Sequence, residues 1–167
     1  MDVLIYLLML IASFLGLIFG VIISRITLEE ITPASKYLKI LNIILVPILI
    51  VISTFYLNKL YSIIFAAIIL AALIVSRERY NDAWVYSCIG ALFYASTLSG
   101  QTFIIATIIF IYGISITTIA ASKHYKKKIN GQATKSETIS LVKKILLKYS
   151  LYPVIAILFL VIFNYIL

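Results

Sequence analysis

Long apolar segments alternate with short polar segments along this chain, and the alternation predicts a bundle of membrane helices. A helix needs roughly 20 apolar residues to cross the hydrocarbon core of a bilayer, which is about 30 Å thick. We therefore expect an all-α fold in which residues 1–167 form a single integral membrane domain with six transmembrane helices. The expected spans are residues 3–24, 40–57, 60–76, 83–99, 102–121 and 152–167.

The hairpin formed by residues 83–121 is expected at the centre of the bundle. Its two apolar helices are joined by Gly100 and Gln101, and they are rich in small and hydroxyl side chains. Small residues at every fourth position lie on one face of a helix and let two backbones approach closely. We expect this face of the first helix to contact another helix of the same chain. Its small residues are Ala83, Ser87, Ala91, Ala95 and Ser99, and the second helix contains Gly113.

The first expected span contains a similar row of small residues, at Ala12, Gly16, Gly20 and Ser24. The two glycines form a GxxxG motif, which in an apolar span indicates close contact with another helix. The partner is either a second copy of the chain or another helix of the same chain. In the second case, the row within residues 83–99 is the simplest partner.

Two prolines shape the expectation for the second helix. A hydroxyl followed by proline is typical of a helix start, so Thr32 and Pro33 predict that this helix begins at Pro33. Pro47 lies inside the same apolar segment. Because proline removes one backbone hydrogen bond and clashes with the preceding turn, we expect a kink there.

Residues 122–148 form an expected cytoplasmic loop, which begins with the longest polar segment, residues 122–133, and continues with a further helical pattern. Residues 134–137 have the form of a capping box, which marks a helix start. An apolar stripe at helical spacing follows, with lysines mostly on the opposite side. We expect an amphipathic helix near residues 134–148 that lies flat on the bilayer surface. Its stripe is Ile139, Val142, Ile145, Leu146 and Tyr149, and its lysines are Lys143, Lys144 and Lys148.

The basic residues predict how the helices are oriented. Of the 14 Lys and Arg residues, all except Lys59 fall in the first, third and fifth loops. Cytoplasmic loops carry an excess of Lys and Arg, so these loops are expected in the cytoplasm of a cell-membrane protein and both termini outside. Trp84 and Tyr86 begin the fourth span, and their rings are expected at the headgroup level.

Composition supports the membrane assignment and limits the partners. The chain is 63% hydrophobic and 12% charged, against about 25% charged residues in soluble domains. Its net charge of +8 lies between the spans, so we expect the bilayer, and anionic lipid at the cytoplasmic face, as partners rather than nucleic acid. Other membrane subunits or a second copy of the chain are further expected partners. Cys88 is the one cysteine and can form no disulfide within the chain.

The spans lack the residues that most intramembrane chemistry uses. No Asp, Glu, Lys, Arg or His lies in the middle of an expected span. Proton relays, voltage sensors and most ion-coupled carriers place such groups within the membrane. The sequence also contains neither an HExxH motif nor a Gly-rich phosphate loop, and we expect no metal and no cofactor.

Charged residues of the first and third loops form one candidate polar cluster on the cytoplasmic side. Its carboxylates could bind a divalent cation, and its guanidinium groups could hold a phosphate headgroup. The simpler interpretation is a set of ion pairs that join the two loops, and we favour it. The cluster consists of Arg25, Glu29, Glu30, Arg77, Glu78, Arg79 and Asp82.

Three functions fit these observations. The first is a non-catalytic helix-packing subunit or assembly factor of a membrane complex, which the small-residue rows and the absence of ionisable groups favour. The second is a channel or carrier for a small neutral solute, since hydroxyl and amide groups can replace a solute's water shell. The third is an enzyme that acts on phospholipid headgroups through the loop charges. The polar path of the second hypothesis would comprise Ser87, Tyr94, Ser96, Thr97, Ser99, Gln101, Thr107, Tyr112, Ser115 and Thr118.

Overall fold

The computed structural model describes residues 2–55, 67, 82–126 and 135–166, and its described elements are all α-helices. Within these described residues, four segments are long and apolar enough to cross a membrane, and residues Ala83–Leu98 form a shorter apolar helix. The chain is thus compatible with a multi-pass membrane protein; the expected span 60–76 lies outside the described residues apart from Ala67. The helices are α1 (Val3–Ile26), α2 (Leu28–Phe55), α4 (Asp82–Leu98), α5 (Thr102–Lys126), α6 (Lys135–Lys148) and α7 (Leu151–Ile166). The four long segments are Val3–Ile26, Pro33–Ser53, Thr102–Tyr125 and Ser136–Ile162.

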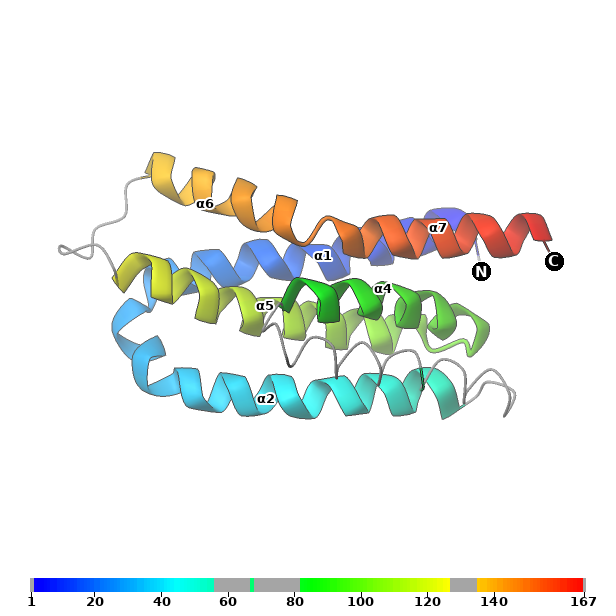
Figure 1. The fold of residues 1–167 in the computed structure, drawn as a ribbon, viewed down its shortest axis with the longest axis horizontal. Helices are drawn as coiled ribbons and strands as arrows, with labels where there is room; N and C mark the ends of the chain where they lie inside the picture. Colours follow the sequence, from blue (N-terminus) through cyan, green and yellow to red (C-terminus); the bar gives the residue numbers. More distant parts are fainter. Residues whose placement is uncertain (1, 56–66, 68–81, 127–134, 167) are drawn as a thin grey trace.

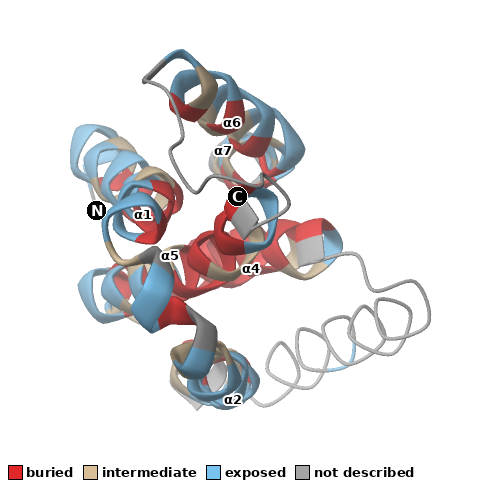
Figure 2. Ribbon diagram, turned by 90° about the vertical axis from the view of Figure 1, so that its left-hand side faces the viewer, coloured by how far each residue is buried: buried red, intermediate tan, exposed pale blue. Residues whose placement is uncertain are grey.

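The helices run along the long axis of an elongated bundle, and both termini lie at the same end (Figure 1). α5 is the central helix, because it packs against α1, α2 and α4. Viewed along the bundle, α4 and α5 occupy the buried middle, while α2 and α6 lie at the periphery (Figure 2). The hairpin of α4 and α5 is therefore central, as predicted, although α5 makes more of its contacts than α4.

The link between α4 and α5 follows from its turn chemistry. Gly100 has a φ of 71°, in the left-handed region that glycine adopts without steric cost. The N–H of Gly100 donates to the carbonyl of Thr97 at 3.4 Å, and the N–H of Gln101 donates to the carbonyl of Ser96 at 3.1 Å. This pair of bonds is a Schellman motif, which satisfies the last carbonyls of α4 and reverses the chain into α5.

The GxxxG motif of α1 packs within the chain, but its partner is α5 and not the predicted row in α4. A Cβ atom at Gly16 would collide with the carbonyl of Phe110, and one at Gly20 would collide with the Thr117 hydroxyl. Gly113 faces α1 from the other side, with its missing Cβ 3.3 Å from the Leu17 nitrogen. Small residues on both helices therefore let the α1 and α5 backbones touch. Ala12, expected in the same row, is exposed, whereas Ser24 is buried.

The centre of the small-residue row in α4, Ala91 and Ala95, contacts another helix of the chain as predicted, but that helix is α7 and not the favoured α1. A Cβ atom at Gly90 would lie 2.6 Å from the Tyr152 carbonyl, which shows how closely the two backbones approach. Ala91 and Ala95 are buried against Ile155 and Phe159 of α7. Of the remaining members, Ala83 and Ser87 are buried and Ser99 is half-buried at the turn.

Two other helices differ from the prediction. α2 begins at Leu28 rather than Pro33, which lies inside the helix, as does Pro47. The first turns of α2 cross the end of the bundle, and the rest of the helix then runs along the long axis of the bundle (Figure 1). Pro33 explains this bend, because it has no N–H to donate to the preceding turn.

α6 forms close to where the amphipathic pattern predicted it, and part of its predicted apolar stripe is buried in the bundle, whereas Ile139 of that stripe is 61% exposed. Leu141 and Ile145 are buried, and α6 packs against α1. One side of the predicted stripe thus packs against the bundle, and the contact of α6 with the bilayer surface stays a prediction. α6 and α7 follow one another along the bundle, and together residues Ser136–Ile162 form one segment that is long and apolar enough to cross a membrane.

Candidate functional site: a buried tyrosine cluster

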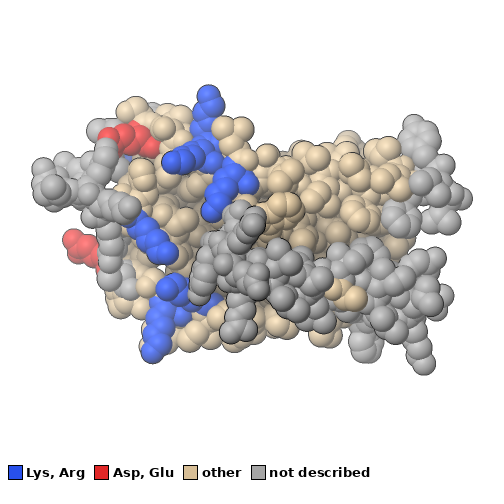
Figure 3. Space-filling view, in the orientation of Figure 1, with Lys and Arg blue, Asp and Glu red and all other residues tan. Residues whose placement is uncertain are grey.

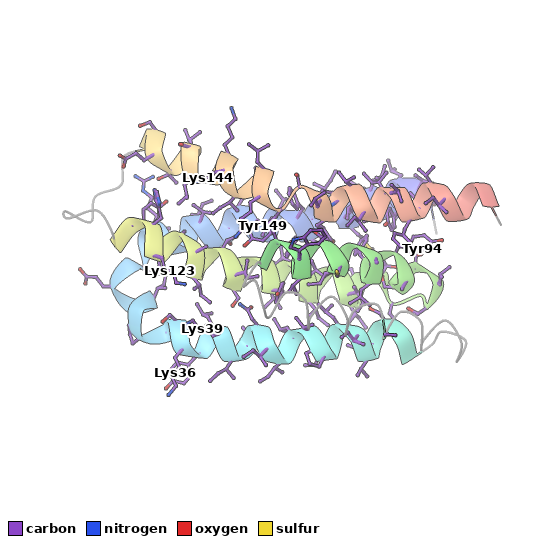
Figure 4. All side chains as sticks on the ribbon, viewed as in Figure 1. Lys36, Lys39, Tyr94, Lys123, Lys144 and Tyr149 are labelled. Atoms are coloured by element: carbon purple, nitrogen blue, oxygen red, sulfur yellow. The ribbon has the colours of Figure 1, made fainter. Side chains whose placement is uncertain are left out.

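α4 and α7 are shorter than α1 and α5, and their first turns meet near the middle of the bundle. They contain 17 and 16 residues, or roughly 25 Å of helix, whereas α1 and α5 contain 24 and 25 residues. Both short helices occupy the half of the bundle that holds the termini (Figure 1). The turn between α6 and α7 lies at the same level, with Tyr149 near the middle of the bundle's length (Figure 4).

Four tyrosines from these elements and from α5 gather at this level, and we call them the tyrosine cluster: Tyr86, Tyr112, Tyr149 and Tyr152. Tyr86 is at the centre, with its ring centroid 4.9 Å from that of Tyr152, 5.3 Å from that of Tyr149 and 6.0 Å from that of Tyr112. The first two pairs are edge-to-face and the third is stacked, which are the geometries that aromatic rings prefer. The cluster thereby joins α4, α5, α7 and the end of α6.

A hydrogen-bonded chain connects the cluster to α1. The hydroxyl oxygens of Ser13 and Tyr152 lie 2.7 Å apart, and Ser13 also donates to the carbonyl of Leu10 at 2.7 Å. Because serine has one hydroxyl proton, Tyr152 is the donor to Ser13. One helical turn further along α7, the Tyr6 hydroxyl donates to the carbonyl of Ala156 at 2.8 Å.

The hydroxyl of Tyr86 points at the contact between α1 and α5. It lies 3.2 Å from the position that a Cβ atom of Gly113 would take. Among the described residues this hydroxyl has no hydrogen-bond partner, although Tyr86 is fully buried. It is thus a buried hydroxyl beside Gly113, at the crossing where Thr118 also donates to the Gly20 carbonyl.

The sequence prediction placed Tyr86 at the headgroup level with Trp84, and this is wrong for Tyr86. Trp84 is 58% exposed and Tyr86 is 0% exposed, because residues two positions apart on a helix point to different sides. Tyr149 and Tyr152 were not predicted as site residues. Their spacing of three positions across the turn at Ser150 is the sequence signal that could have identified them.

A lysine at the end of α6, Lys148, lies beside the tyrosine cluster. The ammonium group of Lys148 is 5.2 Å from the centroid of the Tyr149 ring, within the range of a cation–π contact. On the face shown in Figure 3, the described basic side chains gather over the half of the bundle away from the termini. Lys36, Lys39, Lys123 and Lys144 all lie in that half (Figure 4).

The residues of the predicted polar path do not gather in one place in the structure. Ser96, Thr97 and Thr107 donate to carbonyls of their own helices, and Thr107 is exposed. Ser115 donates to the carbonyl of Leu38 in α2 at 3.1 Å, which ties two helices together. The other members are spread over α4, α5 and the turn between them. Ser99 and Gln101 lie at the turn, and Ser87 and Tyr94 are buried in α4. Tyr112 belongs to the tyrosine cluster, and Thr118 contacts α1.

The predicted charge cluster is only partly described. Arg25, Glu29 and Glu30 are exposed around the α1–α2 turn, and within this turn the structure records no ion pair between them. Arg77, Glu78 and Arg79 lie outside the described residues, as does the side chain of Asp82. In the part of the chain that is described, no three potential metal ligands come together.

Comparisons with known proteins identify no relative of this chain. No protein-family model, no curated protein and no solved structure matches it. The role of the tyrosine cluster must therefore be inferred from its own geometry. That geometry links five helices through ring contacts and hydroxyl groups.

Proposed function

We propose that this protein is a non-catalytic membrane protein that acts as a helix-packing subunit or assembly factor of a membrane complex. One observation supports this most: interior hydroxyl groups connect neighbouring helices. Thr118 donates to the carbonyl of Gly20 at 3.1 Å, and the Tyr152–Ser13 bond joins α7 to α1. Together with the Ser115 bond to α2, these contacts hold the long helices in fixed positions.

The kinds of buried polar group are consistent with this role. Among the described residues, the buried polar side chains other than tyrosine are all serine or threonine. Such hydroxyls can bond to a backbone carbonyl without adding charge to the membrane interior. We infer that the interior polar groups stabilise the helix arrangement, and that function depends on the outer surface of the bundle.

The outer surface is apolar on several helices. α7 exposes Val154, Leu158 and Val161, and α2 exposes Ile43 and Val51. In a membrane these faces contact either lipid or a partner helix. Apolarity alone does not distinguish these two environments, because lipid tails are as apolar as aliphatic side chains. A subunit role requires that at least one of them contacts another protein.

The proposed orientation places the basic end in the cytoplasm and both termini outside, with six membrane helices in total. The charge distribution supports it: the described Lys and Arg residues lie away from the termini, near the α1–α2 turn, the end of α5 and along α6. Cytoplasmic segments are enriched in these residues. The sixth helix is the expected span 60–76, whose position follows from the alternation of basic and non-basic loops.

The experiment that tests this function is purification of the tagged chain from its native host in a mild detergent, followed by native mass spectrometry. We expect a complex that contains a second membrane protein in a fixed ratio. A photo-crosslinking residue at the exposed position Leu158 should capture this partner, whereas the same residue at the buried position Ala156 should not.

The transport hypothesis predicts a different result. If the chain runs alone and proteoliposomes containing it take up glycerol faster than empty liposomes, the subunit role is wrong. Replacement of Ser96 and Thr97 by alanine should then lower the uptake, because both belong to the predicted polar path. Unchanged uptake relative to empty liposomes, with a partner present, supports the subunit role.

A further inference from the structure

An apolar groove lies on the flank of the bundle, between α1, α6 and the start of α7. Its volume is about 480 Å³, and it is lined by Phe14, Val142, Leu146, Leu147, Lys143 and Ser150 among others. This volume is within the range of about 300–1,000 Å³ that small-molecule sites occupy. The lining is almost entirely aliphatic and aromatic, with Lys143 as its charged member.

We propose that this groove binds an anionic phospholipid, with an acyl chain along its apolar floor and the phosphate at Lys143. The inference is independent of the subunit role and requires only that α6 lies in or beside the bilayer. Charge complementarity identifies the ligand, because the charged residue of the lining is a lysine and basic residues at a membrane surface attract anionic lipid.

The arrangement of α6 explains why the groove forms here. Leu141, Ile145 and Tyr149 occupy the buried face of the helix. Val142 and Leu146 lie on the adjacent flank, and Lys143 and Leu147 stand exposed beyond them. An apolar strip bordered by a lysine can therefore take an acyl chain below and a phosphate above, since lysine holds its ammonium at the polar level while its stem covers apolar surface.

The floor of the groove is supported by the tyrosine cluster. Phe14 lines the groove, and its ring stacks on that of Tyr152 with centroids 6.2 Å apart and planes inclined by 12°. Tyr152 is in turn held by Ser13. The position of Phe14 is thereby fixed before a ligand arrives, which reduces the ordering cost of binding.

The groove offers few partners for a soluble polar ligand. The Ser150 hydroxyl already donates to the carbonyl of Leu147 at 2.9 Å, so its proton is not available to a phosphate oxygen. Lys143 is exposed, and no described side chain forms an ion pair with it. A phospholipid fits both the lysine and the apolar lining. Its phosphate supplies the anion for Lys143, and its acyl chain covers the remaining apolar surface.

The test is native mass spectrometry of the full chain with phosphatidylglycerol and phosphatidylcholine that have identical acyl chains. We expect tighter binding of phosphatidylglycerol, and we expect Lys143→Gln to weaken it about five-fold while binding of phosphatidylcholine changes little. Lys144→Gln is the matched control, since it removes the same charge from the next residue, which does not line the groove. It should change the binding of phosphatidylglycerol less than two-fold.

A second variant tests the acyl-chain part of the proposal. Leu147→Trp adds volume at the exposed rim of the groove and should weaken the binding of both lipids, with circular dichroism showing an unchanged helix content. Equal effects of Lys143→Gln and Lys144→Gln would overturn the proposal, because they indicate general attraction between charges. A dimer of the chain that Leu147→Trp abolishes and lipid does not compete with would also overturn it, by assigning the groove to a second copy.

Discussion

Replacement of Gly16 by alanine tests the central helix contact of this fold. An ideal Cβ atom at Gly16 would lie 3.0 Å from both the carbonyl carbon and the Cα atom of Phe110. Carbon atoms in good contact are about 3.5–4.0 Å apart, so α1 has to move away from α5 by about 0.5–1 Å. A gap of that size loses about a quarter to a half of each dispersion contact along the crossing.

The direction of the change in stability distinguishes a close helix contact from a loose one. Overpacking in a well-packed interior costs about 1–3 kcal/mol. Alanine favours a helix over glycine by roughly 0.5–1 kcal/mol, so without the close contact Gly16→Ala would be stabilising. The separation also lengthens the Thr118 bond to Gly20, which is now 3.1 Å. We expect a net loss of about 1–2 kcal/mol in the free energy of unfolding.

The assay is unfolding of the purified chain by sodium dodecyl sulfate, followed by circular dichroism. Ala12→Leu is the control in the same helix, because Ala12 is exposed and a substitution there should change stability by about 0.5 kcal/mol or less. If Gly16→Ala is as stable as the natural chain, or Ala12→Leu is destabilised as much, the contact between α1 and α5 is not as close as described.

Three further predictions follow from the same contacts. Tyr152→Phe should lower the free energy of unfolding by about 1 kcal/mol, because it removes the bond to Ser13, whereas Tyr86→Phe should be neutral or stabilising, since its hydroxyl has no partner among the described residues; equal losses in detergent unfolding would contradict this. Ala91→Leu should cost about 1–3 kcal/mol by forcing α4 away from α7, which chemical crosslinking between the two helices would detect as a lower yield. Gly100→Ala should cost about 1 kcal/mol because of the positive φ, with helix content unchanged, and a stabilised variant would show that the turn can adopt another conformation.

The sequence predicted those parts of the fold that depend on local chemistry. The reversal at Gly100 follows from one glycine between two apolar segments, and the structure confirms it. The amphipathic pattern of residues 134–148 likewise predicted α6, within one residue at its start. In both cases neighbouring residues determine the backbone, so no knowledge of distant contacts is needed.

The partners of each helix were not predictable in the same way. The GxxxG motif shows which face of α1 packs closely, but a one-dimensional pattern does not distinguish between several rows of small residues. The row in α4 has more members than the one around Gly113, yet α1 packs on Gly113 and Thr117. Close contact depends on the local absence of a Cβ atom on both helices, and glycine meets this condition where alanine does not.

The tyrosine cluster was missed for a related reason. An aromatic residue near the end of an apolar segment is typical of the membrane interface. Tyr86 has this position in the sequence, but α4 begins near the middle of the bundle, and Tyr86 lies on the side of α4 that the other helices cover. Helix length and packing, rather than local sequence, decide between the two environments.

Cysteine accessibility in intact cells tests most directly whether the chain forms a membrane bundle with its basic end in the cytoplasm. Cys88 is the one cysteine of the chain, so Cys88→Ser provides a background without thiols. Glu30→Cys and Gln101→Cys then mark the two ends of the bundle. We predict that an impermeant maleimide labels Gln101→Cys in intact cells and Glu30→Cys only after permeabilisation. Labelling of Glu30→Cys in intact cells, with Gln101→Cys protected, would contradict the proposed orientation, and labelling of both would contradict the membrane bundle itself.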